Sequence, residues 1–211
     1  MTDWELLAVL EEAHRNWRDS MYPELSKNYV GGEGADDAPE AMLIGEAPGA
    51  DEDIQQRPFV GPAGMVLRQL MALASLYAGK EIASNCWVTN VVKFRPPRNA
   101  TPSDQMVRSV RLYLHDEWEA IGKPRLIIPI GGVALQAITG RKISILRAAG
   151  KPHYYKSRHA NKGAPPSEMV IWPMVHPSYG IRSRSTQLQE VLEADWERLG
   201  EWRQKNVLHS R

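Results

Sequence analysis

Short apolar runs alternate with stretches of helical periodicity along most of this chain. Each run has the length of a buried strand, and the residues between runs recur at the three- and four-residue spacing of an amphipathic helix. Expected strands occupy 41–45, 86–92, 125–130 and 169–175, and expected helices occupy 2–20, 63–78, 103–118, 133–139 and 188–202. Strands that alternate with helices favour a mostly parallel central sheet flanked by helices. We therefore expect an α/β fold, a three-layer sandwich.

The length of the chain indicates its domain organisation, and its net charge bears on the class of partner. It has 211 residues, 43% of them hydrophobic, which is enough to bury a substantial core. We expect one domain over 1–211, with an N-terminal helix and a basic loop insertion at 151–168. The net charge is +1, so total charge favours no class of partner and any nucleic-acid surface must be local.

The cysteine content and the lengths of the apolar runs exclude several classes of protein. Cys86 is the only cysteine, and it lies in an apolar run typical of a small buried hydrophobic residue. One thiol cannot form an internal disulfide or hold a four-cysteine metal site. No apolar run has the length of a membrane span, and the N-terminal segment lacks the basic start of a signal peptide. We expect a cytoplasmic protein without a membrane partner.

The segment GEAPGADED, residues 45–53, directly follows the first expected strand. Ligands of open α/β sheets bind beyond the carboxyl ends of the strands. The segment crowds acidic side chains, which are Glu46, Asp51, Glu52 and Asp53. Because like charges repel, such crowding at a strand end more often serves a site than a turn. By itself the segment is also compatible with a Mg²⁺ loop or a solvated acidic turn.

The segment RPFVGPAG, residues 57–64, places Phe59 between a proline and glycines. This turn chemistry is poorly suited to a core position, and the chain has only two phenylalanines. Two interpretations are open. Phe59 anchors the loop beneath the acidic turn, or its ring stacks on an extruded base.

The segment TNVVKFRPPRNATP, residues 89–102, begins within the second expected strand. Asn90 interrupts an apolar run, and a buried amide needs hydrogen-bond partners. It either ties down a neighbouring loop or reads the edge of a pyrimidine, whose N3–H and O4 match an amide's acceptor and donor. A stiff basic loop follows, expected to contact DNA through Lys93, Arg95 and Arg98.

The segment HPSYGIRS, residues 176–183, follows the last expected strand and is expected to form a loop. His176 lies where a site is expected, although a lone histidine is more often structural than catalytic. Candidates for holding phosphates are Ser178, Arg182 and Arg184. Candidates for a wedge that unstacks a base step are Tyr179 and Ile181.

Residues 151–168 interrupt the alternation with four Lys or Arg, two His and one acid. This composition is that of a loop. It is either a solvated surface excursion or an arm that contacts phosphates.

Taken in order, GEAPG with a following Glu-Asp, RPFVGPAG, TNVVKFRPP and HPSYGIR resemble the signature of family-four uracil-DNA glycosylases. The correspondence runs from about Met42 to Arg184. Four ordered motifs at compatible spacing make a specific match, which none of them would make alone.

The resemblance implies catalytic roles for three residues. Glu46 corresponds to the carboxylate that positions water or stabilises a cation, and Glu52 corresponds to a second acid that lines the site. His176 corresponds to the residue that hydrogen-bonds the departing base.

The resemblance also implies the groups that hold DNA. Phe59 corresponds to a stacking platform and Asn90 to the reader of the base edge, with Gly45 and Ala47 beside the base. Residues 178–182 correspond to a loop that penetrates the duplex and grips phosphate.

The chain departs from this family at an iron–sulfur cluster. Family-four enzymes hold the cluster with four cysteines, one of them in a KCRPP segment that here reads KFRPP, with Phe94. In place of the family's N-terminal cysteine pair, this chain has Trp17, Ser20 and Met21. We therefore expect no cluster, no other cofactor and no metal, with packing through Trp17 and Phe94 instead. The insertion at 151–168 is a second departure.

The expected function is that of a monofunctional DNA glycosylase. It flips uracil or a modified pyrimidine out of single- or double-stranded DNA and hydrolyses the N-glycosidic bond, leaving an abasic site. We expect a monomer whose partner is DNA. The two departures favour, as an alternative, a glycosylase for a hypermodified pyrimidine of phage DNA. Retention of the motif acids and His176 argues against an inactive DNA-binding module, and a Mg²⁺-dependent nuclease is a further hypothesis.

Overall fold

The computed structural model describes residues 3–35, 38–78, 81–82, 85–155, 169–183 and 186–206. Two sequence-based predictions concern residues outside these ranges: the phosphate contact of Arg184 and the greater part of the basic insertion, 156–168. For Ile181 and Arg182 the structure describes the backbone, as part of a helix.

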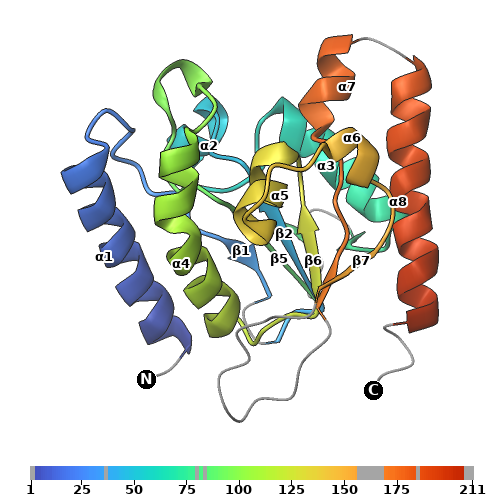
Figure 1. The fold of residues 1–211 in the computed structure, drawn as a ribbon, viewed down its shortest axis with the longest axis horizontal. Helices are drawn as coiled ribbons and strands as arrows, with labels where there is room; N and C mark the ends of the chain where they lie inside the picture. The colour runs from blue at the N-terminus through green and yellow to red at the C-terminus, as the bar shows by residue number, and fades with distance from the viewer. Residues whose placement is uncertain are drawn as a thin grey trace.

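A mixed sheet lies at the centre of the described chain (Figure 1). Its six strands, in spatial order, are β1 (Glu33–Gly34), β5 (Cys86–Asn90), β2 (Ala41–Gly45), β6 (Leu126–Pro129), β8 (Met169–Ile171) and β7 (His153–Tyr155). The four inner strands are parallel, and the two edge strands are antiparallel to their neighbours. The mostly parallel sheet predicted from the alternation is therefore confirmed. A separate small hairpin pairs β3 (Tyr77–Ala78) with β4 (Glu81–Ile82).

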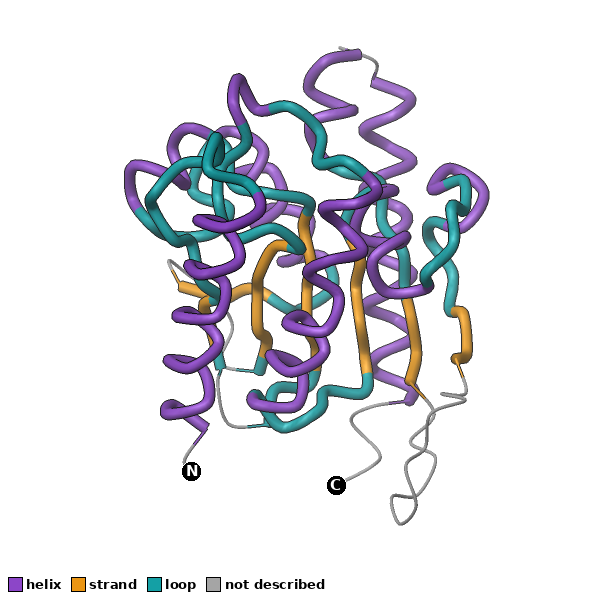
Figure 2. Tube along the Cα trace, turned by 60° about the vertical axis from the view of Figure 1, so that its left-hand side comes forward, coloured by secondary structure: helices purple, strands orange, loops and turns teal. Residues whose placement is uncertain are grey.

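Helices cover both faces of this sheet (Figures 1 and 2). One face packs against α1 (Asp3–Met21), α4 (Asp104–Ala120) and α5 (Gly132–Thr139). The other face packs against α3 (Pro62–Leu73) and α8 (Thr186–Asn206). Shorter helices lie near the carboxyl ends of the strands: α2 (Ala50–Gln55), α6 (Ile145–Ala148), α7 (Pro177–Ser183) and a 3₁₀ turn at Pro97–Asn99. None of the helices in the described ranges is both long and apolar enough to cross a bilayer.

The side chains of β2 explain why this strand reads as a continuous apolar run. Ala41 and Leu43 enter the cluster formed with α3 and α8, whereas Met42 and Ile44 enter the cluster formed with α1 and α4. All four are completely buried. Successive side chains of a strand point to opposite faces, so a strand covered on both sides must be apolar at every position.

The largest corrections to the predicted element lengths concern one helix and one strand. The helix predicted over 63–78 ends at Leu73, because Ser75 adopts a left-handed backbone with φ 55° and β3 follows. The strand predicted over 169–175 ends at Ile171, and beyond it Met174 forms an isolated bridge with Ile130.

Short elements also occur where the sequence predicted loops. The acidic segment contains α2, the segment HPSYGIRS forms α7, and the start of the basic insertion forms the edge strand β7. These elements are only three to seven residues long, too short to show a clear periodicity.

The buried position of β2 gives a stability prediction. Leu43→Ala is expected to lower the free energy of unfolding by about 2–5 kcal/mol, because it removes a fully buried side chain from a packed core. Leu112→Ala on α4 is the matched control, because Leu112 is 75% exposed. Its expected change is within about 0.5 kcal/mol. Urea unfolding measures both, and equal losses would contradict the central position of β2.

Candidate active site

A cavity of about 390 Å³ lies at the carboxyl ends of the parallel strands. Its walls come from the segments that follow β2, β5, β6 and β8, together with α6. The lining residues are Glu46, Ala47, Pro48, Pro96, Asn99, Ala100, Thr101, Gly131, Gly132, Ile145, Leu146, Val175, His176, Ser178 and Tyr179. This is the location that parallel sheets favour for ligands. It brings Glu46 and His176, which are distant in sequence, to one cavity.

The backbone of Glu46 continues the pairing of β2 with β5. The strands are in parallel register, with Gly45 opposite Asn90. Beyond the strand end, the N–H of Val91 donates to Gly45 O at 3.0 Å and the N–H of Val92 donates to Glu46 O at 3.1 Å. Glu46 therefore leaves the sheet from a fixed backbone, with its half-buried side chain at the cavity wall.

Ser178 fixes the protonation pattern of the His176 ring. The backbone N–H of Ser178 donates to His176 Nδ1 at 3.2 Å, and Ser178 Oγ lies 2.8 Å from the same nitrogen. A ring nitrogen that accepts from an amide carries no proton, so the neutral imidazole keeps its proton on Nε2. The donor that this imidazole offers is therefore Nε2–H.

Gly131 at the end of β6 makes room for the histidine. It has a φ of 95°, in the left-handed region that favours glycine. A Cβ at this position would lie 3.4 Å from His176 Cβ. A side chain here would be strained by this backbone conformation, and its Cβ would lie in van der Waals contact with His176.

Phe59 and Asn90 meet across Gly45. A Cβ on Gly45 would collide with Asn90 Oδ1 and with Phe59 Cζ, so the ring and the amide both reach the strand end from which Glu46 departs. Phe59 is 7% exposed and has a positive φ of 55°, and Asn90 is 3% exposed. The structure thus brings Gly45, Phe59 and Asn90 together beside Glu46, behind the residues that line the cavity.

Glu52 occupies a position different from the predicted one. Its Oε2 accepts from the N–H of Gly49 at 3.1 Å, and its Oε1 accepts from the N–H of Gly61 at 2.7 Å. It is not among the residues that line the cavity. Both carboxylate oxygens tie the acidic segment to the loop that carries Phe59, and the role of Glu52 as a second acid of the site stays a prediction.

Lys93 also departs from its predicted role. Its ammonium is 1% exposed and forms an ion pair with Glu117 at 2.6 Å. A buried, paired ammonium has no access to a DNA phosphate, so the prediction of a DNA contact is wrong. Arg98 is exposed, and Arg95 Nε donates to Asn99 Oδ1 at 2.7 Å on the loop that lines the cavity.

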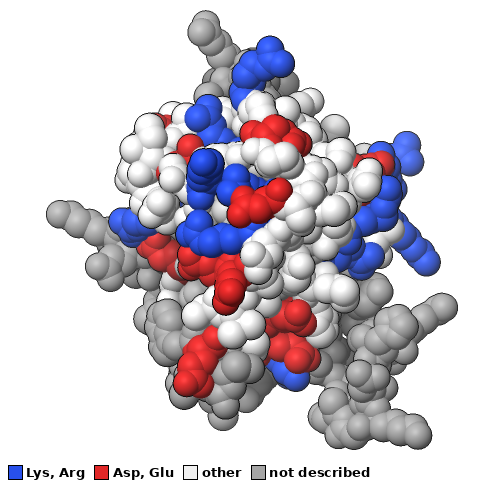
Figure 3. All heavy atoms as spheres, turned by 90° about the vertical axis from the view of Figure 1, so that its left-hand side faces the viewer, with Lys and Arg blue, Asp and Glu red and all other residues white. Residues whose placement is uncertain are grey.

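The segment after β8 contributes Ser178 and Tyr179 to the cavity from the start of α7, so the loop predicted there is a helix. Tyr179 is 47% exposed at the rim. On the face that carries α1 and α4, positive and negative side chains lie beside one another (Figure 3). No single-sign surface dominates that face, in keeping with the net charge of +1.

Several lining residues were not among the predicted site residues. Gly131 and Gly132 directly follow β6, and the rule that ligands bind at strand ends would have found them. Leu146 lies on the four-residue helix α6 and is 62% exposed, and no local pattern marks it.

Comparison with known proteins agrees with this geometry. The model of the "Uracil DNA glycosylase superfamily" matches residues 32–200, which include the sheet and the cavity. The chain therefore belongs to the uracil DNA glycosylase superfamily, and as a member it is a DNA N-glycosylase.

Curated relatives extend over most of the chain. The Type-4 uracil-DNA glycosylase of Thermotoga maritima is 34% identical over 172 residues, 81% of each chain. That of Archaeoglobus fulgidus is 35% identical over 178 residues, 82% of this chain and 81% of the relative. That of Sulfurisphaera tokodaii is 32% identical over 182 residues, 82% of this chain and 74% of the relative. The resemblance inferred from the four motifs is confirmed.

The residues of this chain do not fit the iron–sulfur cluster that the resemblance implies. The sequence has a single cysteine, Cys86, which is fully buried in β5, and burial raises the pKa of its thiol. Within the described ranges, no three His, Cys, Asp or Glu side chains are grouped to hold a metal ion.

An aromatic cluster lies where those cysteines would be expected. Phe94 is fully buried, with the Tyr29 ring 5.6 Å from its own and the Arg18 guanidinium 5.8 Å from its centroid. The Trp17 ring lies 4.9 Å from the Tyr22 ring in a tilted arrangement, and its Nε1 donates to Ser109 Oγ at 3.0 Å. These contacts tie α1 to α4 and to the loop after β5. We call the five ring and guanidinium groups of Trp17, Arg18, Tyr22, Tyr29 and Phe94 the aromatic clip.

The position of Glu52 leads to a prediction about the loops of the site. Glu52→Gln is expected to lower the free energy of unfolding by about 1–3 kcal/mol, because a charged acceptor of two backbone N–H groups is lost. Asp51→Asn, at the exposed neighbour, is the control, with an expected change within about 0.5 kcal/mol. Thermal and urea unfolding compare the two variants, and equal stability would contradict the bracing role of Glu52.

Proposed function

We propose that this protein removes uracil from DNA by hydrolysis of the N-glycosidic bond, as a monofunctional glycosylase that leaves an abasic site. One observation carries the proposal: Glu46 and His176 line the same cavity, and the Gly45–Phe59–Asn90 contact adjoins it. Uracil is the proposed base because the relatives at 32–35% identity are named uracil-DNA glycosylases.

The reaction requires opposite charges to be stabilised on the two sides of one bond. Water adds to C1′ as the C1′–N1 bond breaks, and the bonding electron pair leaves with the base as an anion. The sugar acquires oxocarbenium character during this step. Preorganised groups aimed at the developing charges provide the largest share of such catalysis.

Glu46 and His176 stabilise these two charges in the proposal. The Glu46 carboxylate stabilises the cationic sugar and orients the attacking water. The water oxygen bonds to C1′, and the proton that it releases neutralises the departing base anion. The Nε2–H of His176 donates to a carbonyl oxygen of the departing base. In the neutral imidazole the proton lies on Nε2, because Nδ1 accepts from the backbone N–H of Ser178.

Phe59 and Asn90 recognise the flipped base in the proposal. The aromatic ring provides a stacking surface, and the carboxamide pairs with N3–H and O4 of uracil. Ser178 and Tyr179 at the rim, with Arg95 and Arg98, contact the DNA around the extruded nucleotide. We further propose that the chain acts as a monomer. We also propose that it forms a single three-layer domain, since both hydrophobic clusters share one sheet.

Two substitutions test the catalytic assignments. Glu46→Gln and His176→Ala are each expected to slow single-turnover release of uracil about 100-fold or more, because each removes an interaction worth roughly 3 kcal/mol in the transition state. DNA affinity, measured by fluorescence anisotropy, is expected to stay within about threefold, since these groups act on the bond rather than on phosphates.

Matched controls are Glu201→Gln on α8 and His115→Ala on α4, which change exposed residues outside the cavity. Product analysis must find free uracil and an abasic site. Strand cleavage in place of an abasic site, or unchanged rates in both site variants, would refute the mechanism.

A third substitution tests base reading. Asn90→Asp replaces the amide donor by a carboxylate that cannot donate to O4, so release of uracil is expected to fall at least about tenfold. The measurement is single-turnover release from a panel of oligonucleotides with uracil, cytosine, 5-hydroxymethyluracil and bulkier modified pyrimidines. Asn16→Asp on the exposed surface of α1 is the control. An unchanged preference would count against Asn90 as the reader, and preferential release of a modified pyrimidine by the parent protein would reassign the substrate.

A further inference from the structure

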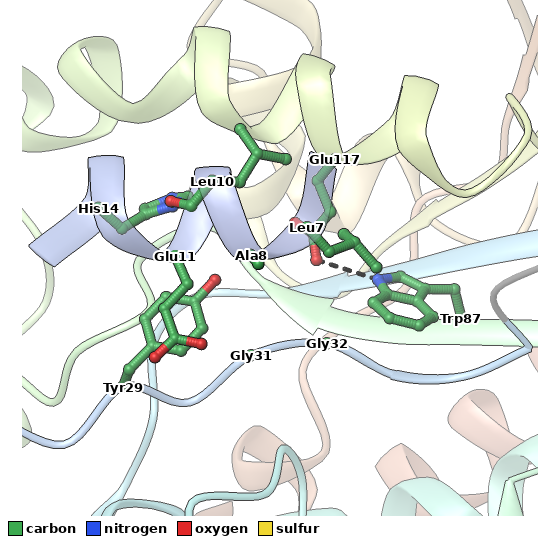
Figure 4. A pocket seen from close by; sticks show the side chains of 10 residues that line it. All are labelled: Leu7, Ala8, Leu10, Glu11, His14, Tyr29, Gly31, Gly32, Trp87 and Glu117. Carbon is green, nitrogen blue, oxygen red and sulfur yellow. Dashed lines mark hydrogen bonds between the residues drawn. The ribbon is translucent and has the colours of Figure 1, made fainter. Parts of the chain in front are cut away.

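Behind β5 lies a buried ion pair that the proposed mechanism does not use. Lys93, in the bend after β5, is 1% exposed, and Glu117 on α4 is 4% exposed. Lys93 Nζ donates to Glu117 Oε2 at 2.6 Å. Glu117 also forms part of the wall of a second cavity of about 250 Å³, between α1 and β5, where its carboxylate accepts from Trp87 Nε1 (Figure 4).

Both charged groups have a complete set of partners. Besides Glu117, the ammonium of Lys93 donates to Thr89 Oγ1 and, at 2.8 Å, to the backbone oxygen of Asn90. Glu117 Oε1 accepts from Trp87 Nε1 at 3.0 Å and from Thr89 Oγ1 at 2.9 Å. The three protons of Lys93 therefore have three acceptors, which a buried ammonium requires.

These hydrogen bonds converge on the carboxyl end of β5. Trp87, Thr89 and Asn90 all belong to that strand, and Asn90 is its last residue. Directly after it, Val91 and Val92 donate to Gly45 O and Glu46 O. The ion pair thus holds the bend whose backbone sets both the side chain of Asn90 and the start of the Glu46 segment.

Stability alone is a poor explanation for such a pair. Removing two charges from water costs free energy that their attraction repays only in part, and apolar replacements are often neutral or stabilising. What the pair provides is a defined geometry, because the ammonium donates at once to Glu117, to Thr89 and to the backbone oxygen of Asn90.

We propose that Lys93 and Glu117 are positioning residues for the base reader Asn90. They hold the carbonyl of Asn90, and through it direct the carboxamide toward the flipped base. This inference rests on the proposed function, in which Asn90 recognises uracil.

The test is a charge-free pair, Lys93→Met with Glu117→Gln, which removes both charges and keeps nearly the same volumes. Single-turnover release of uracil is expected to fall about tenfold or more, because a small misplacement of a positioned group is costly. The loss is expected in the rate at saturating enzyme, with DNA affinity unchanged. The decisive readout is a double-mutant cycle with Asn90→Ala.

In the Asn90→Ala background, the charge-free pair is expected to change the rate by less than about twofold, because residues that act through one group are not additive. An equal fold-loss in both backgrounds would overturn the proposal. If the charge-free protein does not fold, as judged by circular dichroism, Thr89→Val serves in its place. It removes only the bridging hydroxyl, and the same non-additivity with Asn90→Ala is expected.

The chain offers a matched control in a second ion pair that is largely buried. Arg203 on α8 donates from Nε and Nη2 to the two oxygens of Glu40 at 2.7 Å, before the start of β2 and so at the opposite end of the sheet. Glu40→Gln with Arg203→Met is expected to lower the melting temperature without changing the rate of uracil release.

If Lys93→Met with Glu117→Gln likewise lowers only the melting temperature, the Lys93–Glu117 pair is only structural. If the parent protein releases no uracil, the proposed function fails, and if Asn90→Ala alone has no effect, the reader assignment fails.

Discussion

The parallel pairing of β2 with β5 is the interaction on which the site depends. Its register sets Gly45 opposite Asn90, and the pairing continues past the strand ends through Val91 and Val92. A shift of one residue would turn each side chain of β2 to the other face and would separate Asn90 from the start of the Glu46 segment. The sheet therefore fixes the backbone positions of Asn90 and Glu46 together.

The sequence predicted the parts of the fold that depend on long, repeated patterns. The inner strands and the five longer helices follow from apolar runs and helical periodicity, and Ser103 caps α4 where the sequence placed its start. The ends of elements were harder to predict, because Ser75 and the segment after Ile171 depend on tertiary contacts. The elements α2, α6 and α7 are too short to leave a periodic signal.

The candidate site was predicted in its composition and less well in its geometry. The order of the motifs indicated Glu46, His176, Phe59 and Asn90 as site residues, and the structure places them at one end of the sheet. Motif order cannot tell which way a side chain faces. Glu52 and Lys93 have the residue types of a site, yet Glu52 accepts from the backbone of Gly49 and Gly61 and Lys93 pairs with Glu117. These partners depend on how the chain folds and leave no mark in the motifs.

The aromatic clip has a consequence for how the chain reaches its native state. It joins α1 to the loop after β5 through ordinary amino-acid side chains, which include Trp17, Tyr22, Tyr29 and Phe94. No cofactor has to be assembled and inserted to make this link. Formation of this link requires neither iron nor sulfide delivery, and oxygen does not dismantle it. This part of the fold therefore forms by side-chain packing of the polypeptide alone.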